Sequence, residues 1–260
     1  MFLSALFLRG VAVLLMLCDH LALSLSGTLP PLLFYILRGF GRVAFPLFAF
    51  LTVNGYHHTH SPRRYALRLL LFALLSEPCF DRFLHRTWWY PKGQNVFFTL
   101  LLGLLAIMLY DACQKRHRHG WLLGCLGILA ALLGCRLLAT DYGIFGVALI
   151  VALHFAREKR RWQCLAVALF AMRKAGIFYA RYICAALPFF SRFVSSPPKT
   201  PVPPLFDLLT LGAAAALLPL LFYNGKKGKT PQSPVARRVL QYGFYLFYPL
   251  HLLVLGLLFR

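Results

Sequence analysis

The stretch LLMLCDHLAL, residues 14–23, places an aspartate and a histidine inside an apolar run long enough to cross a membrane. An ionised side chain at the centre of a membrane helix costs about 2.5–3.5 kcal/mol on insertion scales. Asp19 therefore needs some compensation within the bilayer, and the rest of the sequence has to indicate what provides it. The run predicts a first membrane helix with further helices packed around it.

The composition extends this prediction to the whole chain. Of 260 residues, 60% are hydrophobic and 13% are charged, which is too little charge to solvate the surface of a soluble domain. Because about 20 apolar residues cross a bilayer, we expect spans at 5–25, 31–55, 65–80, 95–111, 120–138, 142–156, 162–190, 204–223 and 239–259. The fold class is therefore an all-α, polytopic transmembrane helical bundle, with residues 1–260 in a single transmembrane domain and no separate soluble domain.

The number of spans depends on residues 162–190. Arg173, Lys174 and Arg181 interrupt this apolar segment, which fits one long tilted helix, a helix with an interfacial segment, or two short spans. We expect nine spans, with a range of eight to ten.

The net charge of +21 comes from 28 Lys and Arg against 7 Asp and Glu. In a soluble protein this balance would indicate nucleic acid binding. Here the cations form short clusters between apolar spans, which is typical of topology determinants that face lipid headgroups, so no nucleic acid partner is expected. The predicted inner loops carry more than twice as many Lys and Arg as the outer ones, which places the N-terminus in the cytoplasm.

No metal site is predicted. The seven cysteines are scattered without paired spacing. His57, His58 and His60 in GYHHTH lie near no carboxylate or thiolate in the sequence, and we interpret them as an interfacial turn.

Counting depth at 1.5 Å per residue brings most intramembrane polar residues to one layer in the outer half of the bundle. The layer contains Asp19, His20, Arg38, Arg42, Glu77, Asp81, Asn95 and His251. Ion pairing alone, with Asp19 bound to one arginine and Glu77 to the other, would hold helices in register. The whole cluster exceeds what helix docking needs, and favours a water-filled cavity with chemistry.

The segment RGFGR, residues 38–42, sets two arginines four residues apart on one helix face, where they could clamp a phosphate or carboxylate. Gly39 and Gly41 between them allow another backbone or a ligand to approach closely. Pro46 would kink this helix one turn further along the chain.

Five stretches in these regions resemble the TraX family of integral membrane proteins, named for the acetylase of the conjugative pilin N-terminus. They are DH (19–20), LRGFGRVAFPLFAFLTVNGYHHT (37–59), LRLLLFALLSEPCFD (67–81), QNVFFTLLLGLLAI (94–107) and FYPLHLL (247–253). There are departures: Asn54 stands where the family has an acid, and SEPCFD replaces the usual order SEIPFD.

The resemblance implies an acyltransferase in the bacterial cytoplasmic (inner) membrane, with acetyl-CoA as co-substrate and looser kinship to other multispan acyltransferases. The acceptor, an amine or hydroxyl of a pilin N-terminus, a glycan or a lipid, stays open. Carried over by position, the catalytic residues are His20, His251 and Asp19. The binding residues are Arg38, Arg42, Glu77, Asp81 and Asn95.

Together, residues and resemblance suggest that His20 or His251 acts as general base on the acceptor, which attacks the thioester. The arginines would hold the donor phosphates or stabilise the oxyanion. Neighbouring helical residues point about 100° apart, so Asp19 need not pair with His20. The alternative is a proton-coupled transporter that uses the same layer as a relay.

Overall fold

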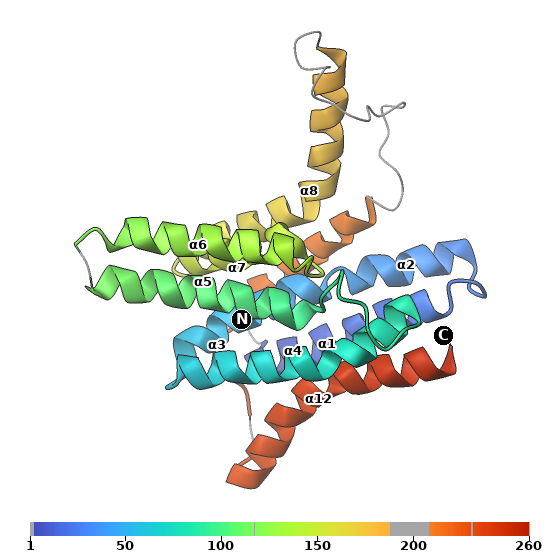
Figure 1. Cartoon of the computed structure of the whole chain (residues 1–260). Coiled ribbons are helices and arrows are strands. Elements are labelled where there is room, and N and C mark those ends of the chain that lie inside the picture. Colours follow the sequence, from blue (N-terminus) through green and yellow to red (C-terminus); the bar gives the residue numbers. More distant parts are fainter. Residues whose placement is uncertain (1–2, 117, 188–207, 230, 260) are drawn as a thin grey trace.

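The computed structural model describes residues 3–116, 118–187, 208–229 and 231–259, and every regular element among them is a helix (Figure 1). The helices are α1 (Ala5–Ser24), α2 (Pro31–Gly41), α3 (Ala44–His58), α4 (Pro62–His85), α5 (Val96–Arg116), α6 (Gly120–Leu137), α7 (Gly143–Phe155), α8 (Arg160–Ala186), the 3-10 helix η1 (Leu209–Ala216), α11 (Leu217–Leu221) and α12 (Pro234–Leu258). The all-α prediction is confirmed.

Each of the nine expected spans corresponds to one helix or to one consecutive pair of helices. Six of them are long and apolar enough to cross a membrane, with the pair α2–α3 counted as one. The segments Gly143–Phe155 and Leu209–Leu221 are shorter apolar helices. The chain is therefore a multi-pass membrane protein, whose backbone groups are satisfied within helices as the bilayer requires.

Pro46 has the effect on the second span that its chemistry predicts. It has no N–H to donate to the carbonyl four residues earlier, that of Arg42. The helix breaks there, with α2 ending at Gly41 and α3 beginning at Ala44. The break leaves both arginines at the end of α2, facing α1.

Residues 160–186 form the single long helix α8, and residues 188–190 of the expected segment lie outside the described residues. A single helix fits two of the three alternatives, one long tilted helix or a helix with an interfacial segment. Its buried residues, Val167, Phe170 and Ala171, all precede Arg173. Figure 1 shows the later part of α8 turning away from the bundle. Arg173, Lys174 and Arg181 therefore lie in the part of α8 that follows its last buried residue.

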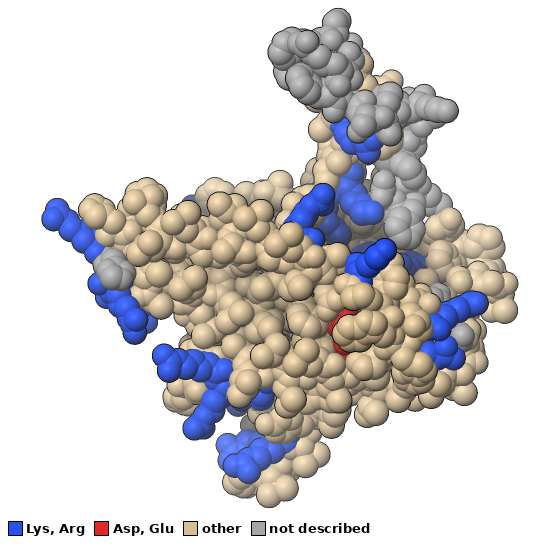
Figure 2. Space-filling view, in the orientation of Figure 1, with Lys and Arg blue, Asp and Glu red and all other residues tan. Residues whose placement is uncertain are grey.

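The loops gather at two ends of the bundle. At one end, which we call the basic end, the first residues of α1 bond to a later loop: the Ala5 and Leu6 amides donate to the Lys226 and Lys227 carbonyls at 2.9 and 3.1 Å. Figure 2 shows Lys and Arg gathered at this end, where α3 leads into α4 and α5 into α6. We call the opposite end the Asp19 end. There the loops at 86–95 and 138–142 are joined by a hydrogen bond, which the Asp141 amide donates to the Gln94 carbonyl.

Candidate functional site

Asp19 is compensated by two arginines at the end of α2. Its Oδ2 accepts from Nη1 of Arg38 at 2.7 Å and from Nη2 of Arg42 at 2.6 Å, and its Oδ1 accepts from Nη2 of Arg42 at 2.7 Å. The Asp19 and Arg38 side chains are only 11% and 10% exposed. Both charges are thus withdrawn from solvent and hold α1 against α2 through charge-assisted hydrogen bonds.

The glycines of RGFGR permit this contact. A Cβ on Gly41 would overlap with the Cβ and carboxylate of Asp19. On the other face of α2, a Cβ on Gly212 in η1 would overlap with the Gly39 carbonyl, so η1 also packs closely on this segment. The close approach expected at the two glycines is present on both sides of α2.

His20 and His251 form a second contact, in which Nδ1 of His20 lies 2.7 Å from Nε2 of His251. His251 Nδ1 lies 2.7 Å from the Phe247 carbonyl, which can only accept, so this nitrogen carries a hydrogen. In a neutral His251, Nε2 is then the acceptor, and Nδ1 of His20 donates to it. The remaining nitrogen, Nε2 of a neutral His20, keeps a free lone pair.

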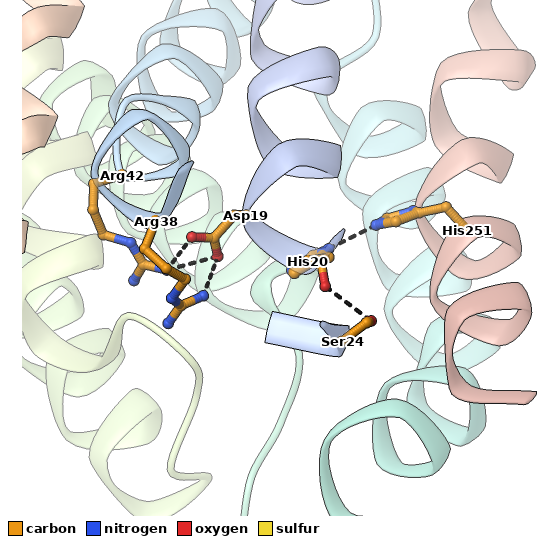
Figure 3. Close-up of polar contacts among 6 residues, drawn as sticks. All are labelled: Asp19, His20, Ser24, Arg38, Arg42 and His251. Carbon is orange, nitrogen blue, oxygen red and sulfur yellow. Dashed lines mark hydrogen bonds and ion pairs between the residues drawn. The ribbon is translucent and has the colours of Figure 1, made fainter. Parts of the chain in front are cut away.

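Asp19 and His20 therefore act on opposite sides of α1, as Figure 3 shows. Asp19 points toward the two arginines, while His20 points toward α12 and His251. His251 is 8% exposed, and Phe83 of α4 and Tyr248 of α12 pack beside the His20 ring. The adjacent pair is not a dyad, and the partner of Asp19 is across the bundle.

The other two acidic residues of the predicted layer bond elsewhere. Glu77 accepts from the side chain and backbone amides of Asn95, and Asp81 accepts from the Tyr90 amide at 2.7 Å. The prediction that Glu77 pairs with one of the two arginines is wrong: in the described part of the chain, Arg38 and Arg42 both bind Asp19. Glu77, Asp81 and Asn95 join α4 to the start of α5 and the loop before it, and their predicted role in substrate binding stays a prediction.

A pocket of about 490 Å³, which we call the basic pocket, opens at the basic end. Five cationic side chains line it: Arg9, Arg64, Arg68, Lys227 and Arg237. No carboxylate is among the described residues that line this pocket. Tyr223 also lines it, and its phenol oxygen accepts from the Asn54 side-chain amide at 3.0 Å. The pocket suits an anionic ligand with several phosphates.

A smaller pocket of about 80 Å³, which we call the apolar pocket, lies next to the basic pocket between α1, α3, α4, α5 and α12. The two pockets share the lining residues Arg9, Leu51, Tyr65 and Tyr245. The apolar pocket extends to Met16 and Tyr248. Met16 is one helical turn before His20, and Tyr248 is three residues before His251, so the apolar pocket ends about one turn from the histidine pair.

Comparison with known proteins now bears on this geometry. Residues 4–259 match the profile of a protein family described as TraX protein. The chain belongs to the TraX family. It is also 31% identical over 262 residues to the probable fimbrial assembly protein FimC, serogroup H1, of Dichelobacter nodosus, covering 97% of this chain and 94% of that relative. No solved structure shows a significant match.

This TraX family member has a second, partly buried network of polar contacts at the basic end, which the sequence interpretation missed. His57, assigned to an interfacial turn, lies 3.2 Å from His154 through Nε2 and Nδ1. His154 Nε2 lies 3.1 Å from Asp111 Oδ1, and the Tyr56 hydroxyl donates to Asp111 Oδ2 at 2.8 Å. Arg157 Nη1 lies 2.9 Å from Nδ1 of His57.

The hydrogen bonds of this network can all donate in one direction: Arg157 donates to His57, His57 donates to His154, and His154 donates to Asp111. It ties the ends of α3, α5 and α7 together in the TraX bundle. Depth counting could have found it, because His57, Asp111 and His154 each lie at the basic end of an expected span.

Proposed function

We propose that this TraX family member is a membrane acyltransferase that moves an acetyl group from acetyl-CoA to an amine or hydroxyl acceptor. The observation that carries the proposal is the order of three features along the bundle: the basic pocket, the apolar pocket that shares four lining residues with it, and the histidine pair about one helical turn beyond. Family membership and the likeness to a probable fimbrial assembly protein support a role in fimbria or pilus assembly. The acceptor we infer first is therefore the amine of a fimbrial subunit.

The pockets match the two parts of an acyl-CoA in order. The basic pocket offers guanidinium and ammonium groups to the phosphates of the nucleotide end, and its position at the basic end fits a cytoplasmic donor. The apolar pocket would hold the extended acyl-pantetheine arm. At about 80 Å³ it admits such a chain only when lining side chains move apart. Tyr65 and Tyr245 line both pockets and are our candidates for the side chains that move.

The chemical step follows from the hydrogen-bond directions at His20. Nε2 of His20 takes the proton of the acceptor amine or hydroxyl as that nitrogen or oxygen bonds to the thioester carbonyl carbon. The His20 imidazolium is stabilised by its Nδ1–H bond to His251, whose own Nδ1–H is fixed by the Phe247 carbonyl. When the C–S bond breaks, the same His20 nitrogen returns the proton to the thiolate.

This scheme changes the roles that the sequence suggested. His20 is the base and His251 is its orienting partner. Arg38 and Arg42 face away from the histidine pair, so they are removed from the oxyanion, and the donor phosphates fit the basic pocket instead. The ring of Tyr248 packs beside both imidazoles, and this residue lines the apolar pocket. Its hydroxyl is our candidate donor to the carbonyl oxygen.

The test uses purified protein in lipid nanodiscs with radiolabelled acetyl-CoA and a peptide carrying the N-terminal amine of a fimbrial subunit. His20→Gln should lower kcat about 10²–10⁴-fold, as expected for loss of a general base. His251→Gln should lower it less, because His20 keeps its lone pair. His119→Gln, the same change at an exposed loop position, is the matched control.

Three results separate the possibilities. Acetyl transfer lost in His20→Gln and kept in His119→Gln supports the proposal. Full turnover in His20→Gln would refute the mechanism. Substrate-dependent proton flux in liposomes, with no release of free coenzyme A, would instead support the transporter.

A further inference from the structure

The first half of α12, residues 234–247, forms one wall of both the basic pocket and the apolar pocket. We call this segment the α12 arm. Arg237 and Tyr245 of the arm line the basic pocket, and Phe244 and Tyr245 line the apolar pocket. A movement of the arm would therefore change the width of the space in which the proposed donor lies.

The arm is less firmly packed than the rest of α12. The buried residues of this helix begin at Tyr248, and none of residues 234–247 is buried. Figure 1 shows the first part of α12 directed away from the bundle, while the last part lies along it. A segment with few buried apolar contacts has low local stability, so the arm is the part of α12 that moves most easily.

The contacts that join the arm to other helices are near its inner end. The rings of Tyr245 and Phe72 stack with centroids 4.9 Å apart, and the Arg9 guanidinium lies 5.4 Å from the centre of the Phe244 ring. Within the described part of the chain, residues 234–241 make no hydrogen bond, ion pair or ring contact with another helix. The outer end of the arm is therefore free of polar and aromatic ties.

A proline lies where the arm joins the buried half of the helix. Pro249 is inside α12, and without an N–H it cannot donate to the carbonyl four residues earlier, that of Tyr245. Proline is one of the few features at which helices bend sharply. The arm is about 21 Å long at 1.5 Å per residue, so a change of about 20° in the bend moves its far end by about 7 Å.

The charges of the basic pocket act on the arm. Arg237 lines this pocket together with four cations from other segments, Arg9, Arg64, Arg68 and Lys227. None of the five forms an ion pair with a described residue. Because like charges repel, the other four cations disfavour a close approach of Arg237. Phosphates between them would attract all five and draw the arm toward the bundle.

We propose that the α12 arm is a lid, hinged at Pro249, which opens the apolar pocket to the acyl-pantetheine chain and closes when Arg237 binds the phosphates of the donor. The lid rests on the proposed function, because it takes acetyl-CoA as the anionic ligand. It supplies the movement that a pocket of about 80 Å³ needs before an extended chain enters, since the arm carries Tyr245. Closure retains the donor without contacting the reacting atoms, so Arg237 is a binding residue that positions the lid.

Spin labels can report the position of the arm in phosphatidylcholine nanodiscs. Val235 in the arm and Leu126 in α6 are 70% and 60% exposed, and each is replaced by p-acetylphenylalanine, whose ketone takes a nitroxide. Double electron–electron resonance measures the distance between the labels with and without coenzyme A, a probe that carries no acetyl group. Coenzyme A should shorten the main distance by several Å, up to about 7 Å, and narrow its distribution.

Three variants test how the lid works. Arg237→Gln should abolish the shortening at saturating coenzyme A. The matched control is Arg238→Gln, which changes an exposed neighbour outside the pocket lining and should keep the shortening. Pro249→Ala restores the missing N–H, and should reduce the shortening to less than half by stiffening the bend. Binding of radiolabelled coenzyme A to each variant is measured in parallel, so that saturation is known.

The outcomes separate the lid from the proposed function. Binding of coenzyme A without any change in distance overturns the lid and leaves the donor site intact. Equal shortening in Arg237→Gln and Arg238→Gln also overturns it, and full shortening in Pro249→Ala overturns the hinge. No binding of coenzyme A to the wild type overturns both the lid and the donor site. If Pro249→Ala does not fold, the comparison of Arg237→Gln with Arg238→Gln decides.

Discussion

Replacing Asp19 by asparagine tests how the bundle tolerates an aspartate in its first membrane helix. Asparagine has nearly the same shape, so the change removes charge without creating a cavity. The aspartate accepts from both arginines through two oxygens, at 2.6–2.7 Å. An asparagine offers one acceptor oxygen, and its NH₂ group faces a guanidinium N–H, so two donors oppose each other.

The expected cost is large because the pair is buried. With side chains that are 11%, 10% and 20% exposed for Asp19, Arg38 and Arg42, removal of the carboxylate leaves uncompensated cations inside the protein. We expect the free energy of unfolding to fall by about 3–5 kcal/mol. Glu158→Gln is the matched comparison: the Glu158–Arg157 pair is 2.8 Å long, but its side chains are 74% and 51% exposed. It should cost about 0–1 kcal/mol.

The assay is reversible unfolding of the purified protein in mixed micelles with increasing dodecyl sulfate, followed by circular dichroism. A cycle with Arg38→Gln shows whether the loss comes from charge. Removing one orphaned cation should recover part of the loss, with a coupling energy of at least about 1 kcal/mol between the two sites. The reasoning is refuted if Asp19→Asn costs no more than Glu158→Gln, or if the losses in the cycle simply add.

Three further outcomes are expected. Gly41→Ala should lower the free energy of unfolding by about 1–3 kcal/mol, because the new methyl group overlaps with Asp19 and forces α1 and α2 apart. Asp111→Asn should cost about 1–3 kcal/mol and increase hydrogen exchange at the joined ends of α3, α5 and α7, since it removes one of two acceptor oxygens that are both in use. Arg64→Gln and Arg237→Gln should each raise KM for acetyl-CoA about tenfold with kcat within about twofold, because their groups bind the donor away from the reacting atoms.

Each of these outcomes has a control of the same chemical type. Gly10→Ala, where a methyl group would meet nothing within 4 Å, should be neutral or stabilising by up to about 1 kcal/mol. Glu158→Gln should leave hydrogen exchange in α5 unchanged, and Arg116→Gln, an exposed cation outside the basic pocket lining, should leave KM unchanged. Equal effects in a variant and its control would contradict the corresponding prediction.

The helices could be predicted because membrane spans are encoded by length and apolarity, which are local properties. Residues 5–25 and 95–111 each give an apolar run of span length, and α1 and α5 follow them closely. The sequence does not predict the course of α8. Arg173, Lys174 and Arg181 disfavour a buried span, but they do not determine the direction that the helix takes. The outcome depends on packing: the residues that bury are all on the near side of Arg173.

The sequence predicts the depth of each polar residue in the membrane, but it does not predict the direction in which the side chain points from its helix. A fixed rise per residue placed Asp19 and the two arginines at one level, and the structure pairs them. The same count placed Glu77 there, but Glu77 points toward Asn95. Direction around a helix axis depends on how neighbouring helices pack, which one sequence does not specify.

The contacts on the two sides of α1 depend on each other. Consecutive residues on a helix point about 100° apart, so fixing the direction of Asp19 also fixes the direction of His20. The two arginines hold Asp19 through three hydrogen bonds, and Gly41 lets α1 come close enough for them to form. The ion pair therefore sets the rotation of α1 about its axis, and this rotation brings His20 to His251. On this argument Asp19 serves the proposed chemistry as a positioning residue, through the helix that it orients, without touching the imidazole beside it in the sequence.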